Sequence, residues 1–183
     1  MIVLDSFYKK QDLGSSNLSI GVFDGLHLGH ALVLKKLKEK EGKSIVFTFE
    51  NHPLDILKPD IKIQKIYEKQ DTLKYLKSFD IDVVIMIKFD KNFADISYID
   101  FFKILKENFS FTNLIVGKDV KIGKDGKGDL NKIKSLENIL NFKSEFIEKI
   151  KYENRVISSR WIRSLIEEKN YVLAEKLLNR KFL

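Results

Sequence analysis

The chain has 183 residues, of which 44% are hydrophobic and 11% aromatic, and it has no cysteine; this composition is typical of a folded domain and excludes disulfide bonds, thiolate catalysis and cysteine metal sites. Its net charge of +7 suits a polyphosphate ligand as well as nucleic acid, but the lysines are scattered along the chain, so we expect small-molecule substrates and no nucleic acid. No apolar run is long enough to cross a membrane and residues 1–10 lack a secretory signal, so we expect a cytoplasmic protein without membrane contact.

Strand and helix patterns alternate along the chain, which is typical of an open α/β sheet with parallel strands. Four short apolar runs have the composition of strands buried on both faces: Leu18–Phe23, Ser44–Phe49, Val83–Phe89 and Asn113–Val116. Helical periodicity predicts six helices: Leu28–Glu41, Lys69–Phe79, Tyr98–Glu107, Leu130–Leu140, Ser159–Lys169 and Val172–Asn179. An antiparallel piece is expected over Glu145–Val156. We find no internal repeat or linker, so the sequence predicts a single domain with a helical C-terminal segment.

The turn GVFDGLHLGH, Gly21–His30, joins the first predicted strand to the first predicted helix. Its glycines allow a tight bend and a close ligand, and the helix start offers unpaired N–H groups to a phosphate. His27 and His30 are three residues apart, so they project from one helical face. The alternative is a Gly-rich turn with a structural histidine. The coincidence of glycines, histidines and junction favours chemistry on a phosphate.

Two further segments follow predicted strands and are expected at the same sheet edge, where ligands bind in such folds. FENHP, Phe49–Pro53, contains His52, the third and last histidine of the chain. The loop Val116–Leu130 has four glycines, and it is either a solvated loop or a mobile flap in which Asp119 accepts hydrogen bonds.

The segment ISSRWIR, Ile157–Arg163, opens the next-to-last predicted helix. Either Ser158 or Ser159 suits the N-cap position of that helix. Arg163 lies about one turn further on, and its planar guanidinium suits bidentate contact with phosphate, although a surface arginine is the plain alternative.

Together these segments resemble a known family. GVFDGLHLGH resembles the G-x-F-D-G-x-H-x-G-H signature of the nucleotidyltransferase superfamily, and FENHP resembles the F-x-P-H-P element of bacterial FAD synthetases. VGKDVKIGKDGKGDL is similar to their V-G-x-D-F-x-F-G-x-x-x-x-G-D loop, ISSRWIR to I-S-S-T-x-I-R, and AEKLLNRKF to A-x-x-L-L-G-R-x-Y. The motifs occur in the family's order over residues 18–182. The resemblance is to the FMN adenylyltransferase module of bifunctional riboflavin kinase/FAD synthetases, and it implies a Rossmann-like fold.

The resemblance implies that FMN attacks the α-phosphate of ATP in line, giving FAD and pyrophosphate, with Mg²⁺ bound through the phosphates and either Asp119 or Asp129. His27, His30, Ser159 and Arg163 would act on the phosphates. The full set expected at ATP is Gly21, Phe23, Asp24, Gly25, His27, Gly29, His30, Ser158, Ser159 and Arg163. The set expected at the flavin is Phe49, Asn51, His52, Pro53, Asp119, Gly128 and Asp129.

The chain departs from the family pattern at several of these motifs. Arg160 stands where the family has threonine and Trp161 where it has arginine, and Arg160 either binds phosphate itself or blocks the site. Asn51 replaces a proline, and Val120 and Ile122 replace two phenylalanines able to stack on the flavin ring.

The chain stops at Leu183, so we expect one adenylyltransferase domain over residues 1–183 and no riboflavin kinase domain. Two alternatives stay open. One is a non-catalytic or reduced flavin- or nucleotide-binding protein, and the other is an adenylyltransferase acting on a different phosphomonoester. The sequence makes no prediction of oligomeric state.

Overall fold

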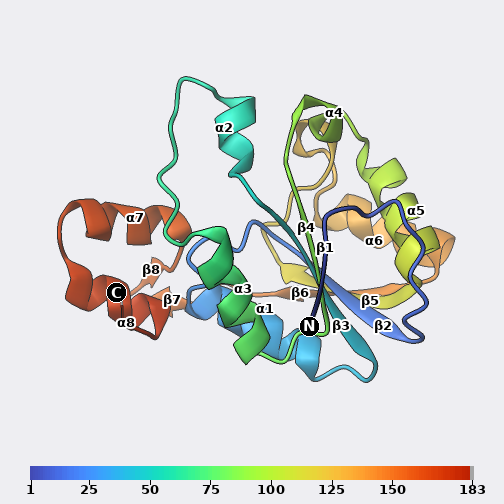
Figure 1. Cartoon of the computed structure of the whole chain (residues 1–183), viewed down its shortest axis with the longest axis horizontal. Coiled ribbons are helices and arrows are strands. Elements are labelled where there is room, and N and C mark those ends of the chain that lie inside the picture. Colours follow the sequence, from blue (N-terminus) through green and yellow to red (C-terminus); the bar gives the residue numbers. More distant parts are fainter. Residues whose placement is uncertain (182–183) are drawn as a thin grey trace.

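A computed structural model describes residues 1–181 of the chain (Figure 1). Within them, one six-stranded sheet has the order β1-β4-β3-β2-β5-β6, and every neighbouring pair is parallel. The strands are β1 (Ile2–Leu4), β2 (Ser16–Ile20), β3 (Lys43–Phe49), β4 (Val83–Ile87), β5 (Phe111–Gly117) and β6 (Lys143–Ile147). The chain runs from β2 to β3 in one direction and returns to β5 on the other side of β2. The predicted Rossmann-like sheet is therefore confirmed, with a topological switch point between β2 and β5.

The helices of the described chain are α1 (Leu28–Lys38), α2 (Pro53–Leu57), α3 (Lys69–Ser78), α4 (Lys91–Ala94), α5 (Tyr98–Phe109), the 3₁₀ turn η1 (Lys124–Gly126), α6 (Leu130–Leu140), α7 (Ser159–Glu167) and α8 (Tyr171–Leu178). The short strands β7 (Lys151–Tyr152) and β8 (Arg155–Val156) form a hairpin. Figure 1 shows α7, α8 and this hairpin grouped at one end of the molecule, beside the sheet. No helix within residues 1–181 is long and apolar enough to span a bilayer.

Alternation along the strands builds two cores, because successive side chains point to opposite faces of a sheet. Phe47 and Ile85 pack toward α5 and α6, whereas Val46 and Val84 pack toward α1 and α3. A third cluster, of Ile66, Ile157 and the apolar faces of α7 and α8, lies apart from both.

The sequence prediction for Glu145–Val156 is wrong in its first half. Lys143–Ile147 is a parallel edge strand on β5, and only residues 151–156 form an antiparallel hairpin. Glu153 and Asn154, with φ of 46° and 66°, close that hairpin in the left-handed conformation. The half-buried, mixed sequence of an edge strand lacks the continuous apolar run by which the inner strands were recognised.

Other boundaries also differ from the prediction. The strand predicted to reach Phe23 ends at Ile20, because Phe23 already has a positive φ of 50° in the following turn. The short elements β1, α2, α4 and η1 were not predicted. Phe182, the last residue of the motif Ala174–Phe182, lies outside the described residues.

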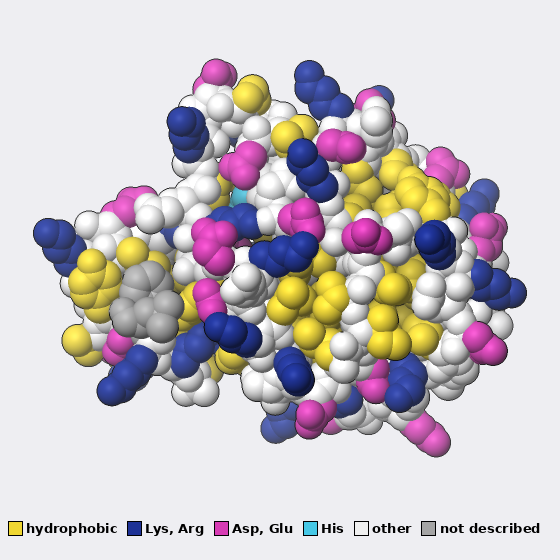
Figure 2. All heavy atoms as spheres, viewed as in Figure 1, with side chains coloured by type: hydrophobic (Ala, Val, Ile, Leu, Met, Phe, Trp, Pro, Cys, Tyr) yellow, Lys and Arg dark blue, Asp and Glu magenta, His cyan; other side chains and the backbone are white. Residues whose placement is uncertain are grey.

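Figure 2 shows basic and acidic side chains interspersed over the visible face, with hydrophobic side chains exposed between them. Basic side chains form no continuous stripe on this face, in keeping with the scattered lysines of the sequence.

Candidate active site

A cavity of about 820 Å³ opens at the carboxyl ends of the strands, at the switch point between β2 and β5. It is large enough for a nucleotide-sized ligand. Its lining brings together ten of the residues expected at the site: Gly21, Phe23, His27, Gly29, His30, Phe49, Pro53, Asp119, Ser158 and Ser159. Segments separated by more than a hundred residues in the chain therefore converge on one space.

The turn between β2 and α1 has an unusual backbone. Phe23 and Leu26 have φ of 50° and 44°, although both side chains are bulky and buried. Left-handed backbone costs a non-glycine residue about 1–2 kcal/mol, so surrounding contacts must hold this conformation. Gly25 has φ of 78°, and a Cβ there would lie 2.7 Å from Ile66 Cδ1. The turn is thus both strained and closely packed, which is typical of functional loops.

His27 is the N-cap of α1. Its Nδ1 accepts hydrogen bonds from the backbone N–H groups of Gly29 at 3.1 Å and His30 at 3.4 Å. The neutral ring therefore carries its proton on Nε2. Two helix-start N–H groups that the sequence predicted to be free for phosphate are used by His27 itself. What faces the cavity instead is the imidazole.

Burial lowers the pKa of His27 to about 4, whereas a hydrogen bond with its own backbone acts in the opposite direction; the charge of Arg180 lowers the pKa further and the charge of Asp119 raises it. His27 is accordingly neutral at physiological pH. Neutral imidazole can donate from Nε2 without a proton first being taken up.

His30 stacks on His27, with ring centroids 3.8 Å apart and planes inclined by 16°. Burial, the neighbouring His27 and Arg180 all lower the pKa of His30, well below its usual value. Its Nδ1 is buried and has no hydrogen-bond partner among residues 1–181. A buried polar atom without a partner costs about 1–3 kcal/mol, so this atom indicates a ligand or water that completes the site.

Asp24 ties the turn to α7. Its Oδ1 accepts from the backbone N–H of Ile66 at 3.0 Å, and its Oδ2 pairs with Arg163 Nη1. The Ser159 hydroxyl donates to the Asp24 carbonyl at 2.7 Å. The carboxylate side chain is only 6% exposed, so it acts within the protein and does not face the large cavity.

Arg163 lies behind the turn. Its side chain is 17% exposed, and it does not line the large cavity of the described chain. The Ser158 hydroxyl accepts from Trp161 N at 3.3 Å, which makes Ser158 the cap of α7, and both Ser158 and Ser159 line the cavity.

The FENHP segment, which follows β3, is hydrogen-bonded to Phe89, which follows β4. Asn51 Oδ1 accepts from Phe89 N at 2.8 Å, and Asn51 Nδ2 donates to Phe89 O at 3.0 Å. His52 caps α2, since its Nδ1 accepts from Leu54 N at 3.2 Å, while Asp55 accepts from His52 N. Burial and then the charge of Arg163 lower the pKa of His52.

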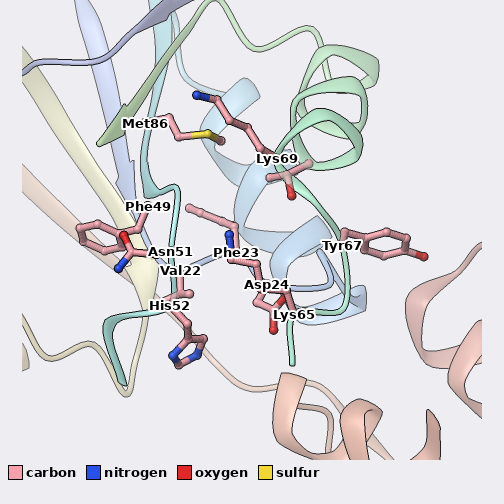
Figure 3. A pocket seen from close by; sticks show the side chains of 11 residues that line it. Val22, Phe23, Asp24, Phe49, Asn51, His52, Lys65, Tyr67, Lys69 and Met86 are labelled. Carbon is pink, nitrogen blue, oxygen red and sulfur yellow. The ribbon is translucent and has the colours of Figure 1, made fainter. Parts of the chain in front are cut away.

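Asn51 and His52 border a second, small pocket, with Asp24 and Lys65 opposite them (Figure 3). It holds about 20 Å³, enough for about one water molecule. Of the FENHP residues, Phe49 and Pro53 reach the large cavity, whereas Asn51 and His52 do not.

The glycine-rich loop is anchored to the connection between α4 and α5. Lys124 N donates to Ile96 O at 2.8 Å, and Lys124 Nζ pairs with Asp95 at 2.7 Å. A Cβ on Gly123 would lie 2.3 Å from Tyr98 N, and one on Gly128 would lie 2.6 Å from Tyr98 Cβ. Gly128 thus serves packing of the loop.

The two carboxylates expected near a metal differ in their surroundings. Asp119 lines the cavity, is 64% exposed, and pairs with Lys149 through Oδ2 at 2.8 Å. Asp129 Oδ1 accepts from Lys132 N at 3.0 Å as the cap of α6, and Asp129 lies outside the cavity lining. Groups of three or more metal-ligating side chains are absent from the described residues. Asp119 fits Mg²⁺, which usually takes one or two carboxylates plus phosphate oxygens, and Asp129 does not.

Arg160 and Trp161, the two residues of α7 that depart from the family pattern, do not fill the cavity. Trp161 is 7% exposed in the third core cluster, with the Arg155 guanidinium 4.4 Å from its ring centroid. Arg160 is exposed and, like Trp161, is absent from the cavity lining in the described chain. Obstruction of the site by Arg160 is therefore not observed.

Phenylalanines form an apolar wall of the cavity. Phe49 lies edge-on to Phe89 at 5.3 Å and to Phe93 at 5.4 Å between ring centroids. Val120 and Ile122 line the same cavity as aliphatic side chains. Phe89 and Phe93 were not identified from the sequence as site residues; their positions at the end of the predicted strand Val83–Phe89 and four residues after it were the available signal.

Comparison with solved structures supports the fold. A structure described as a macrolide-efflux protein from Streptococcus pneumoniae has a TM-score of 0.86 at 22% identity, over 98% of this chain and 61% of that chain. Pantoate-β-alanine ligase from Francisella tularensis has a TM-score of 0.59 at 19% identity, over 96% of this chain and 78% of that one. At these identities the likeness concerns the fold alone.

Sequence comparison identifies the family. Bifunctional riboflavin kinase/FMN adenylyltransferase of Buchnera aphidicola subsp. Schizaphis graminum is 35% identical over 176 residues, which are 92% of this chain and 56% of that protein. The Bacillus subtilis protein of the same name is 28% identical, over 94% of this chain and 56% of its own length. The chain thus spans little more than half the length of these relatives. A family model described as FAD synthetase matches residues 9–161, and the chain belongs to the FAD synthetase family.

Proposed function

We propose that the chain is an FMN adenylyltransferase, which transfers AMP from ATP to FMN and releases pyrophosphate. The observation that carries the proposal is the stacked pair of neutral histidines at the cavity, with the buried and unpartnered Nδ1 of His30. Family membership and the names of the relatives support the choice of substrates. We propose that residues 1–183 act as one unit. We further propose that this unit works in the cytoplasm, since its proposed substrate is ATP.

The FMN phosphate is itself the nucleophile, so the site needs no Ser-His-Asp arrangement. It must bring two anions together in line and stabilise the charge on the transferred phosphate and the leaving group. His27 would donate from Nε2 and His30 from the ring nitrogen that lacks a partner, because both rings are neutral. Ser158 and Ser159 line the same side and supply further polar contacts.

Arg163 would hold the departing pyrophosphate by reaching past the turn on binding, because its side chain does not line the cavity in this structure. Its guanidinium has five N–H donors, and its pairing with Asp24 uses Nη1. The remaining donors suit phosphate oxygens, and Asp24 fixes the side chain's direction. This assignment agrees with the role that the family resemblance implies for Arg163.

Mg²⁺, held by Asp119 and the phosphates of ATP, would neutralise charge on the polyphosphate. Lys149 keeps the Asp119 carboxylate beside the cavity through its 2.8 Å ion pair.

The apolar wall supports a flavin as the acceptor. Phe49, Phe89 and Phe93 offer ring edges and faces to a large aromatic ligand, and Val120 and Ile122 add aliphatic surface to the same lining. Small phosphomonoesters without a flat ring system would leave this wall uncovered. We therefore propose FMN as the acceptor.

Incubation of the purified chain with ATP, Mg²⁺ and FMN, followed by chromatography for FAD and a pyrophosphate assay, tests the proposal. FAD and pyrophosphate in equal amounts are expected, with no FAD from riboflavin, which lacks the attacking phosphate. Product from nicotinamide mononucleotide or phosphopantetheine, and none from FMN, would assign a different acceptor. ATP binding without any product would make the chain a non-catalytic nucleotide-binding protein.

A further inference from the structure

Arg180, just after α8, reaches back to the turn that precedes His27. Its Nη1 donates to the Leu26 carbonyl at 3.3 Å, and its Nη2 donates to the Gly25 carbonyl. Its Nε donates to the Tyr67 hydroxyl at 3.1 Å. The guanidinium also lies over two aromatic rings, 3.8 Å from the Tyr75 centroid and 4.4 Å from the Tyr67 centroid. These three hydrogen bonds and two ring contacts fix the Arg180 guanidinium against the turn.

The two carbonyls that Arg180 binds belong to left-handed residues, with φ of 78° at Gly25 and 44° at Leu26. The strained conformation at Leu26 persists only because its surroundings hold it. Leu26 is also the residue immediately before His27, so its peptide group sets the direction in which α1 and the imidazole begin. The planar fork of arginine matches two adjacent carbonyls, which the single ammonium of lysine does not.

We propose that Arg180 is a positioning residue: by holding the Gly25 and Leu26 carbonyls, it keeps His27 and His30 aimed at the phosphates of ATP. This inference rests on the proposed function. It adds the C-terminal segment to the active site, although Arg180 itself touches the turn and not the cavity lining. Its positive charge also lowers the pKa of both histidines, in the same direction as their burial.

Three variants test the proposal. Arg180→Met keeps an apolar side chain between the two tyrosines and removes every donor. Arg180→Lys keeps the charge without the fork. Lys181→Met removes an exposed cation next along the chain and is the matched control. Circular dichroism and thermal unfolding establish that each variant is folded at the assay temperature.

In folded Arg180→Met we expect kcat to fall about 10-fold to 100-fold, because displacement of catalytic groups by about 1 Å has effects of that size. Arg180→Lys should recover only part of the loss, and Lys181→Met should equal the unaltered chain. If Arg180→Met does not fold, the comparison of Arg180→Lys with Lys181→Met decides. Equal kcat in the folded Arg180 variants and the control would overturn the proposal.

Two readouts do not depend on FAD formation. ATP affinity without FMN should weaken in Arg180→Met and not in Lys181→Met. The NMR titration of His27 should move upward from about 4 in Arg180→Met, with Asp119 as the other charged group that acts on it. Movement in both readouts would support positioning by Arg180 even if FMN proved not to be the acceptor. Unchanged ATP affinity and an unchanged His27 titration would refute positioning.

Discussion

Replacement of His27 by asparagine separates its two roles, as helix cap and as phosphate donor. Asparagine is among the best N-cap residues, so its side-chain oxygen can replace Nδ1 as acceptor for the Gly29 and His30 N–H groups. The Nε2 donor and the ring stacked on His30 are lost. We therefore expect a folded protein with α1 intact and with little adenylyl transfer.

His27→Asn should change two measurable quantities, kcat and the pH dependence of the free energy of unfolding, and the size of each follows from the site. Loss of one preorganised donor typically lowers kcat by about 10²–10³, or roughly 2.7–4 kcal/mol. The unfolded chain binds a proton at His27 near pH 6.5, whereas the folded chain binds it near pH 4. Between these values the unfolded state holds more protons, so the free energy of unfolding falls as the pH decreases from 6.5 to 4. For this group the fall amounts to about 3 kcal/mol, and His27→Asn lacks it.

FAD formation at pH 7.5 measures the change in kcat. Urea unfolding of His27→Asn and the unaltered chain between pH 7.5 and 4 measures the change in the pH dependence of stability. His52→Asn, the same change at the N-cap of α2, controls for the cap itself. Near-normal kcat in His27→Asn would refute the role of His27 as phosphate donor. Parallel curves of stability against pH for His27→Asn and the unaltered chain would refute the lowered pKa, since they would mean that His27 titrates alike in the folded and unfolded states.

Three further outcomes are expected. Arg163→Ala leaves Asp24 buried without its cation, so the free energy of unfolding should fall by about 3–5 kcal/mol and kcat by about 10²–10³; adding Asp24→Asn should restore stability in urea but not FAD formation. Gly123→Ala should destabilise the protein by more than 1 kcal/mol in thermal unfolding, because its Cβ would lie 2.3 Å from Tyr98 N. The control Gly14→Ala, at a position with φ of 64° and open space around it, should cost only about 1 kcal/mol. Equal losses of stability in the two variants would contradict the packing argument. Burial tends to raise the pKa of Asp82, but hydrogen bonds from Ser44 and Lys43 hold it well below its usual value. The contribution of Asp82 to stability is therefore present at neutral pH and lost as the pH falls below about 3.8. Asp82→Asn should make the free energy of unfolding depend less on pH in this acid range, and an unchanged pH dependence would contradict the prediction.

The inner strands and the longer helices could be predicted because their burial is written in local sequence. Val83–Ile87 is a continuous apolar run buried on both faces, and α6 was predicted over its observed range, Leu130–Leu140. Short elements could not be predicted, because β1 has three residues and α2 has five, too few to show a period. Their structure depends on pairing with β4 and on the His52 cap.

The position of the candidate site in the fold could be predicted from the sequence, but the contacts of its residues could not. The histidine turn, the loop that carries Asp119 and part of the FENHP segment line one cavity at the sheet edge, where their positions after strands placed them. That His27 caps its own helix and that Asp24 binds Arg163 could not be inferred, since both depend on side-chain directions. The contact of Arg180 with Leu26 joins residues 154 positions apart, which no local pattern reveals.

The long-range contacts of the turn have a consequence for when the turn is completed during synthesis. Asp24 to Leu26 emerge early from the ribosome, but their partners Ser159, Arg163 and Arg180 are made 135 to 155 positions later. Such non-local contacts form late in folding, after the sheet that brings the segments together. A nascent chain interrupted before α7 would carry the full histidine signature without the contacts that hold it. Under the proposed function, the turn therefore becomes able to hold ATP only after residues 159–180 have been made and folded.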